Sequence, residues 1–297
     1  MRPILRPGVR ALRRDRHSLQ FGLDWPGATV VAATPALDAV LDCIDGVRDS
    51  RAVVLAAAAC GVDPATCAQT LSSLIERGLV VDGNSRRPGD VPEATWTAWS
   101  LLAGALGDAD EIAQSRASTA VAIEGDGAVA DAVRRLLPGA HVRVCETGSS
   151  ADLIVRACDL EPARTDSDHA LSVGRPHLWA TVRDCVGLVG PLVVPGETAC
   201  LRCVDAARSD LDPAWPVLVE ATTTVRPVVS PVDEALAAAV AALAVHEVAV
   251  YASRRGPQTL NGLIEVPYGF GPVQRVALSP HPQCGCGWPT WQDTMGA

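Results

Sequence analysis

Four cysteines near the C-terminal third of the chain form two short pairs that could hold a metal ion. Cys200 and Cys203 are spaced as C-x-x-C, and Cys284 and Cys286 as C-x-C with Gly285 between them. Zinc binds four soft ligands at tetrahedral corners, about 2.3 Å from the metal. Glycine tolerates the positive φ that a tight turn between two ligands requires. Because four thiolates would fill every coordination position, we predict a structural zinc site and not a catalytic one.

Two other interpretations of these cysteines stay open, a C-x-x-C redox pair and four unrelated thiols. A redox pair is expected near the start of a βαβ unit, and a zinc site requires that the two short pairs meet in space. The remaining cysteines lie in apolar segments and are predicted to be core residues: Cys43, Cys60, Cys67, Cys145, Cys158 and Cys185.

A glycine loop follows a predicted strand and opens a predicted helix. The loop runs Gly125-Asp126-Gly127, and Glu146 ends the next predicted strand about 20 residues further on, where dinucleotide sites carry an acid for the ribose. Asp126 lies in the turn that a phosphate would approach and would repel it. The loop therefore predicts a nucleotide site only weakly.

The elements that must position these residues fall into two domains. Residues 1–17 carry arginines against one acid and are predicted to be a solvated basic tail. Residues 18–83 predict a small winged-helix-like α+β module, and residues 84–95, rich in Gly, Pro and Ser, a linker. The module is expected to contain, in this order, strands 18–24 and 28–33, helices 35–44, 51–60 and 64–77, and strand 79–81. Thr34, Ser50 and Asp63 are expected to cap the three helices.

Residues 96–297 predict a Rossmann-like α/β domain that begins with one bridging helix over residues 96–113. The expected strands are 118–123, 141–145, 153–157, 178–182 and 186–194, with helices at 128–137 and 166–171. Strands that alternate with helices predict a parallel sheet with right-handed crossovers. The apolar segment 235–252 is interrupted by His246 and Glu247 and predicts a buried helix and not a membrane span.

Composition excludes some classes of function. The chain of 297 residues has a net charge of −9, which disfavours nucleic acid and anionic membranes as partners. All 25 basic residues are arginine, so any mechanism that needs a lysine from this chain is excluded. The sequence has no apolar stretch typical of a signal peptide, which predicts a cytoplasmic protein, where ten cysteines favour metal ligands and free thiols.

Several of these motifs together resemble a known superfamily. They are the cysteine knuckle behind Gly190-Pro191 and Pro195-Gly196, the glycine loop, the strand that ends at Asp159, and the terminal His281-Pro-Gln-Cys-Gly-Cys286. Over residues 118–288 the chain resembles the ThiF, or ubiquitin-activating-like, superfamily. It is most similar to the bacterial cyclodehydratase branch of actinobacterial type, which serves the biosynthesis of azole-modified peptides and bacteriocins. Residues 18–83 resemble the PqqD-like peptide-recognition module of that branch.

The resemblance implies a nucleotide site and a peptide partner, with departures. Adenylating members use a glycine loop, an arginine, a lysine and an acid that organises magnesium; Gly125, Gly127 and Asp159 match, and Glu146 completes the candidate site. The chain has no lysine, and only five residues separate Glu146 from Asp152, so the segment that carries the arginine and lysine is missing. Developing phosphate charge needs positioned cations, and we therefore expect that ATP and magnesium are not used.

The predicted function is that of a non-catalytic pseudoenzyme. The chain would bind the leader of a ribosomal peptide as a strand added to the edge of residues 18–33, beside the helix 64–77 that offers Leu71, Leu74 and Ile75, and present it to a YcaO-type enzyme. A homodimer is a further candidate assembly. The alternatives are a ThiF-like adenylyltransferase that uses ATP and, third, a winged-helix DNA-binding protein, whose third helix carries only Arg77 as a cation.

Overall fold

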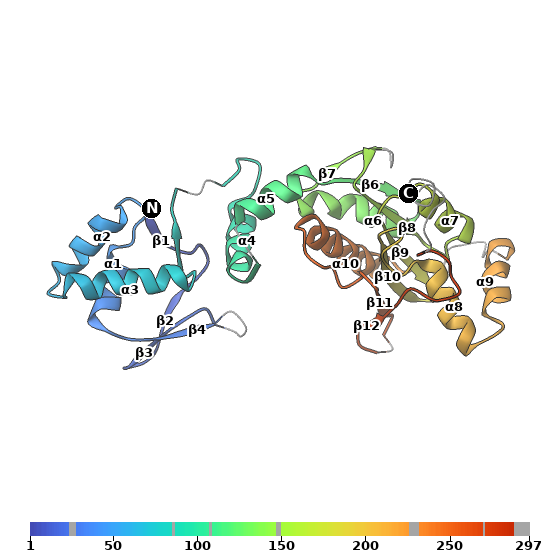
Figure 1. Ribbon diagram of the computed structural model, residues 1–297. Coiled ribbons are helices and arrows are strands. Elements are labelled where there is room, and N and C mark those ends of the chain that lie inside the picture. The colour runs from blue at the N-terminus through green and yellow to red at the C-terminus, as the bar shows by residue number, and fades with distance from the viewer. Residues whose placement is uncertain are drawn as a thin grey trace, which may run out of the picture. The chain divides into compact units, whose positions relative to one another are not determined.

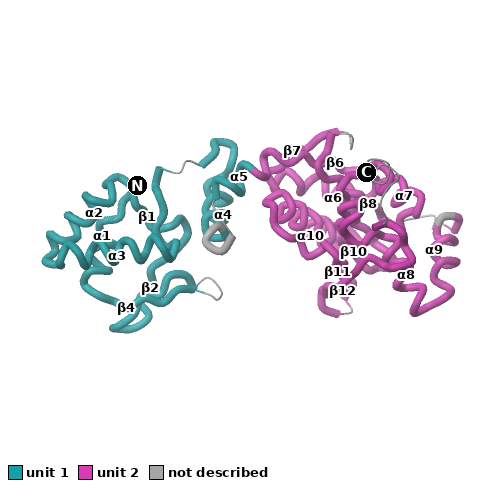
Figure 2. Tube along the Cα trace, in the orientation of Figure 1, with its two compact units in different colours: residues 1–114 teal, residues 115–297 magenta. Residues whose placement is uncertain are grey.

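The protein folds as two compact units, residues 1–114 and 115–297 (Figure 2). The computed structural model describes residues 1–23, 28–84, 87–106, 109–146, 150–225, 232–269 and 271–287. Each unit has its own hydrophobic core, as expected of units that fold separately.

Unit 1 combines small antiparallel sheets with helices. Its elements are β1 Pro3–Leu5, β2 Ala11–Asp15, β3 Ser18–Phe21, β4 Thr29–Ala32, α1 Pro35–Cys43, α2 Ser50–Ala58, α3 Pro64–Glu76, β5 Val80–Asp82, α4 Glu93–Leu106 and the first part of α5 Ala109–Ser118, which continues into unit 2 (Figure 1). The strands β2, β3 and β4 form one sheet with β3 in the centre, and β1 pairs with β5. Phe21, Leu37, Val53 and Leu74 are fully buried between the sheet and the first three helices.

The first 17 residues are not the solvated tail that their basic composition predicts. In β1, Pro3 pairs with Asp82, and in β2, Ala11 pairs with Phe21. Strand pairing uses backbone hydrogen bonds, which do not depend on side-chain charge. Arg13 and Arg14 therefore remain exposed to water while their backbone belongs to the sheet.

The predicted helix caps are confirmed at two of three sites. Thr34 Oγ1 accepts a hydrogen bond from Leu37 N at 3.1 Å, and Asp63 accepts one from Thr66 N at 2.9 Å. The prediction for α2 is wrong by one residue. Asp49 is the cap and accepts from Ala52 N at 2.8 Å, and Ser50 is the first helical residue, because either side chain can cap and only the backbone angles decide between them.

The single helix predicted for residues 96–113 is replaced by α4 and α5. Their apolar side chains form a separate cluster of Val91, Trp96, Trp99, Ala109, Ile112 and Ala113. The helix α4 also approaches the N-terminal segment closely, since a Cβ on Gly8 would lie 2.9 Å from Thr97. Accordingly the boundary between the compact units follows Gln114, whereas the predicted boundary follows the linker at residues 84–95.

Unit 2 contains one large sheet with helices. Its elements are β6 Ala120–Glu124, α6 Ala128–Leu136, β7 Arg143–Val144, β8 Leu153–Cys158, α7 Arg164–Ser172, β9 His177–Arg183, β10 Val186–Val193, α8 Leu201–Leu211, α9 Trp215–Thr224, α10 Glu234–Ala252, β11 Gly262–Pro267 and β12 Gln274–Ala277. The strand order is β12-β11-β10-β9-β8-β6-β7. The strand predicted over 141–145 is only the short β7.

The sheet is mixed, so the prediction of a parallel sheet holds for only part of it. β7, β6, β8 and β9 are parallel, whereas β9, β10, β11 and β12 run antiparallel. The reversal occurs at Asp184 and Cys185, which have φ values of 49° and 61°. Two residues with positive φ form a tight hairpin turn, and such a turn can join only antiparallel neighbours.

Helices α6 and α10 bury one face of the sheet. Val129 and Val133 of α6 share a core with Val121, Val155 and other strand residues. In the described part of the chain α10 is the one helix whose length and apolar composition would suffice to cross a membrane. Half of that helix is buried inside the unit, in agreement with the predicted core helix.

Candidate functional site

A cavity of about 640 Å³ opens at the carboxyl ends of two parallel strands, β6 and β8. In open α/β sheets this end of the strands is where ligands bind. The cavity is lined by residues 124–127, 156–163, Asp166 and Trp179. It therefore includes the predicted glycine loop and the end of the strand that leads to Asp159.

The start of α6 already holds a carboxylate. Asp159 accepts hydrogen bonds from the backbone N–H groups of Ala128 at 2.8 Å and Val129 at 2.9 Å. Gly127 has a φ of 94°, and a Cβ there would collide with the Asp159 carboxylate. A helix N-terminus of this kind is a binding site for phosphate. Here the Asp159 carboxylate takes the place that an anionic ligand would occupy.

The charges around the cavity are mostly negative. Its acidic lining residues are Glu124, Asp126, Asp159, Glu161 and Asp166. Among the described lining residues Arg156 is the one cation, and its Nη2 lies 2.8 Å from Glu124 Oε2. The Arg156 guanidinium also lies 5.7 Å from the centroid of the Trp179 ring. A triphosphate would consequently enter a cavity whose single positive charge is already paired.

A thiol in the cavity wall is not an activated nucleophile. Burial raises the pKa of Cys158 to about 12, and its Sγ lies 3.1 Å from the carbonyl oxygen of Leu160. The thiolate is the reactive form of cysteine. Cys158 therefore stays protonated near neutral pH and contributes no nucleophile.

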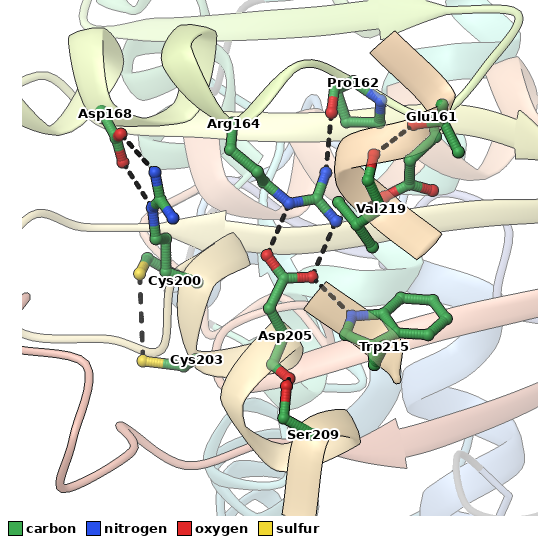
Figure 3. Close-up of polar contacts among 12 residues, drawn as sticks. Glu161, Pro162, Arg164, Asp168, Cys200, Cys203, Asp205, Ser209, Trp215 and Val219 are labelled. Atoms are coloured by element: carbon green, nitrogen blue, oxygen red, sulfur yellow. Dashed lines mark hydrogen bonds and ion pairs between the residues drawn. The ribbon is translucent and has the colours of Figure 1, made fainter. Parts of the chain in front are cut away.

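A buried ion-pair network forms the wall next to the cavity (Figure 3). Arg164 donates Nε and Nη2 to the Asp205 carboxylate at 2.5 and 2.7 Å, and Nη2 to Glu161 at 2.6 Å. Trp215 Nε1 donates to Asp205 Oδ1 at 3.0 Å. The network thus joins α7, α8 and α9. The Arg164 charge is neutralised within the network, so this arginine is engaged in structure and not directed at a ligand.

The two cysteine pairs meet in space, as the metal prediction requires. The Sγ atoms of Cys200, Cys203, Cys284 and Cys286 all lie within 4.8 Å of one another. Cys200 Sγ lies 3.5 Å from Cys284 Sγ, and Cys203 Sγ lies 3.4 Å from Cys286 Sγ. Four sulfurs at tetrahedral corners about 2.3 Å from a zinc ion would be about 3.8 Å apart. The cluster is therefore compatible with a structural zinc ion.

Hydrogen bonds favour a thiolate within this cluster. The pKa of Cys203 lies well below its ordinary value, because the Cys200 thiol and the backbone N–H of His281 donate to its sulfur. The His281 ring in turn lies 3.1 Å from Asp210 Oδ2. Backbone and ring contacts of one residue thereby hold the C-terminal knuckle against α8, as outer contacts of metal sites commonly do.

The structure brings three of the four predicted nucleotide-site residues together. Gly125, Gly127 and Asp159 line the same cavity, whereas Glu146 follows β7 and is not among the lining residues. Arg156 and Trp179 also line the cavity and were not predicted from the sequence. These two residues lie side by side because Arg156 of β8 pairs in register with Trp179 of β9. Strand register could not be inferred from the spacing of the residues in the chain.

Solved structures identify the fold. The chain has the fold of MccB. The structure of E. coli MccB is superimposed with a TM-score of 0.66 over 97% of both chains, at 15% sequence identity. The predicted resemblance is confirmed at the level of the fold alone.

Two heterocyclase structures share the fold over part of their length. The heterocyclase TruD matches 96% of this chain with a TM-score of 0.71 at 18% identity, and a heterocyclase in complex with substrate and cofactor matches 99% with a TM-score of 0.72 at 17% identity. The present chain spans 42% of the first heterocyclase and 40% of the second.

Sequence comparisons add no closer relative. No protein-family model matches the chain, and no curated protein matches its sequence. MccB has been solved with ATP, and also with AMPCPP together with MccA. At identities of 15–18% the likeness of these proteins to the present chain establishes the fold alone.

Proposed function

We propose that this chain is a non-catalytic peptide-binding and docking protein of ribosomal-peptide modification, which presents a leader peptide to a separate YcaO-type cyclodehydratase in the cytoplasm. The observation that carries the proposal is the Asp159 carboxylate at the start of α6, within the fold of MccB and the heterocyclases. A scaffold whose phosphate position is filled by its own side chain suits binding better than adenylation.

The likeness to two heterocyclases supports a role in the same kind of peptide modification. Nearly the whole of this chain corresponds to about two fifths of each heterocyclase chain. In the proposal this part supplies binding and docking.

An edge of the three-stranded sheet supports peptide binding. Ala33 N donates to His17 O at 2.8 Å, and hydrogen-bonded pairs alternate along an antiparallel ladder. Val31 therefore directs its backbone groups to β3, whereas Val30 and Ala32 direct theirs away from the sheet. Among the described strands none pairs with this side of β4. An extended leader could add there through main-chain hydrogen bonds.

Two details of the predicted peptide site change. The strand over residues 18–24, which the prediction includes in the binding edge, is the central strand β3, so β4 offers the edge. Leu71 and Leu74 are buried in the core of unit 1 and cannot line a groove, while Ile75 is half-buried. The core needs those leucines because α3 packs on α1 and α2 through them.

The function is tested by titrating the full-length protein with the leader peptides encoded beside its gene, followed by backbone NMR. We expect the largest shifts at Val30 and Ala32, whose backbone groups point outward. The dissociation constant should be near micromolar, which corresponds to a binding free energy of about −8 kcal/mol. Shifts confined to unit 2 for every leader, or no shifts at all, would contradict the clamp.

The second candidate function is an ATP-dependent adenylyltransferase. The observation in its favour is the cavity of about 640 Å³ at the glycine loop. MccB has the same fold, and its structure has been solved with ATP. We predict no exchange of pyrophosphate into ATP in the presence of magnesium and leader peptide, because Asp159 fills the helix start and the one cation of the lining is paired. Exchange that Asp159→Ala abolishes would establish the enzyme.

The control for this assay uses a residue of the same loop. Asp126→Ala removes an acid without touching the hydrogen bonds to α6, so residual exchange that both variants share would come from contamination. The cysteine cluster is proposed to hold one structural zinc ion in either case.

A further inference from the structure

The arginine-rich segment at residues 10–17 has no role in the proposed leader site. It contains four arginines, one histidine and one acid, in a chain whose net charge is −9. The segment is not a solvated tail, because most of it forms β2, an edge strand of the sheet β2-β3-β4. Its arginines are therefore carried by a fixed backbone, and the strand determines on which face of the sheet each of them lies.

The strand β2 leaves one side of its backbone without a strand partner in the described part of unit 1. Gly22 N donates to Arg10 O at 3.1 Å, and bonded pairs alternate along an antiparallel ladder. Ala11 and Arg13 therefore direct their backbone N–H and C=O groups away from β3. Both residues are exposed, so an added strand could reach these groups without displacing the core.

The side chains of this edge divide between the two faces of the sheet. Leu19 of β3 is buried toward the helices, so its neighbour Gln20 and the residue paired with it, Leu12, lie on the opposite, open face. Arg14 Nη1 donates to Gln20 Oε1 at 3.0 Å and so lies on the same face. The alternation of the strand adds Arg10. An apolar side chain thus lies between two arginines on the open face.

The two arginines of the open face form no ion pair with a described acid. In the described part of the hairpin the one ion pair is that of Arg13, whose Nη2 lies 3.4 Å from Asp38 of α1. The carboxylate of Asp15 accepts from the backbone N–H of His17 at 2.7 Å. Positive side chains on an edge strand hinder its pairing with other basic strands, whereas opposite charges on neighbouring strands attract. The edge is therefore selective for an acidic strand.

We propose that β2 is a docking edge for an extended acidic segment of a partner protein. The main chain of this segment would pair with Ala11 and Arg13. An apolar side chain would lie beside Leu12, and acids two positions away on either side would lie next to Arg10 and Arg14. Strand addition takes its affinity from the main chain and its specificity from the side chains. The pattern expected in the partner is acid-x-apolar-x-acid.

Nucleic acid and anionic membranes fit this edge less well. Neither offers alternating N–H and C=O groups to the outward backbone of Ala11 and Arg13, and the net charge of −9 repels both. The docking edge is also separate from the leader site, because β2 and β4 are opposite edges of one sheet with β3 between them. A partner at β2 and a leader at β4 could therefore be bound together, and neither requires the other.

The test is an NMR titration of the full chain at low salt with the acetylated, amidated peptide Glu-Thr-Val-Thr-Glu. Its sequence reads the same in both directions, so either strand direction is possible. We expect saturable shifts of the Ala11 and Arg13 amides. The corresponding peptide with glutamine in place of glutamate should bind about five-fold more weakly, as expected for the loss of two exposed ion pairs. This difference should nearly vanish at about 0.5 M salt, which screens exposed charges.

Reversing the charge of the edge should reverse its preference. The double variant Arg10→Glu and Arg14→Glu should lose the glutamate peptide and bind Arg-Thr-Val-Thr-Arg, an exchange that a folding defect cannot produce. Ala11→Pro removes an outward N–H and should abolish binding of the glutamate peptide. The matched control is Arg51→Glu combined with Arg77→Glu, which makes the same change of charge at exposed arginines outside the sheet and should leave binding unchanged.

Three results would overturn the docking edge. They are shifts that avoid Ala11 and Arg13, equal affinity for the glutamate and glutamine peptides at low salt, and a charge-reversed protein that still prefers the glutamate peptide. Oligothymidylate that shifts the Arg10 and Arg14 amides more strongly than the peptide would assign the edge to nucleic acid instead. Leader binding at β4 with no response of β2 to the acidic peptide would remove this surface and leave the proposed function standing.

Discussion

At the residue scale, a buried histidine makes the stability of unit 2 depend on pH. His177 has no exposed surface, and its Nδ1 lies 3.0 Å from the carbonyl oxygen of Arg175. Its Nε2 has no hydrogen-bond partner. Desolvation lowers the pKa of His177 to about 4. The folded protein therefore keeps this ring neutral through a pH range in which the unfolded chain binds a proton.

We predict that unfolding free energy falls as pH drops from about 6.5, the pKa of an unperturbed histidine, to the folded value of about 4. In that window the unfolded state binds more protons, so stability rises with pH. At pH 5 the contribution of this residue should be a loss of about 2 kcal/mol relative to pH 7. Urea unfolding of wild type and His177→Gln at both values measures it, and equal losses in the two proteins would refute it.

The cysteine cluster permits a direct prediction at the same scale. Purified protein should contain about one zinc ion per chain, held by four thiolates. Cys203→Ser removes the sulfur that accepts from the Cys200 thiol and from His281 N, and should lower both zinc content and stability. The control is Cys185→Ser, at a cysteine that was predicted to lie in the core but is exposed in a hairpin turn. Zinc-free wild-type protein with all four thiols open to alkylation would exclude the metal.

At the element scale, the position of β4 decides where a proline blocks peptide addition. Val30 directs its N–H away from β3, so Val30→Pro removes an outward donor and keeps the ladder. We predict that this variant loses leader binding while its circular dichroism is unchanged.

The matched control lies at the opposite edge of the same sheet. Gly22 N donates to Arg10 O at 3.1 Å, so the alternation of the ladder turns the backbone of Ala11 outward from β2. Ala11→Pro should retain binding. Loss of binding in both variants with intact folding would show that the peptide does not add at β4.

At the scale of the whole molecule, the metal and the peptide sites belong to different compact units. The cysteine cluster lies in residues 115–297, and the β4 edge in residues 1–114. Since metal binding stabilises only the state that contains the site, we predict that a chelator speeds hydrogen exchange in unit 2 and leaves β3 and α3 protected. Exchange that increases equally in both units would indicate that they unfold as one.

Residue types with strict geometric demands were predictable from the sequence. Cys200, Cys203, Cys284 and Cys286 form one cluster, because cysteine pairs at such spacing have few other uses. Thr34 and Asp63 cap their helices because a cap is a local contact within three residues. The glycine loop at Gly125 and Gly127 lies where its spacing between strand and helix predicts.

The tertiary structure alone decided the features that depend on partners distant in the chain. β1 and β2 form because backbone groups of β5 and β3 are available to them, and the arginine-rich sequence of β2 has no apolar alternation that would signal a strand. Asp159 reaches the start of α6 because β8 lies beside β6. The hydrogen bond from Ala128 N to Asp159 joins residues that are 31 positions apart in the chain. Strand pairing is not a property of local sequence, since it arises only when segments are brought together.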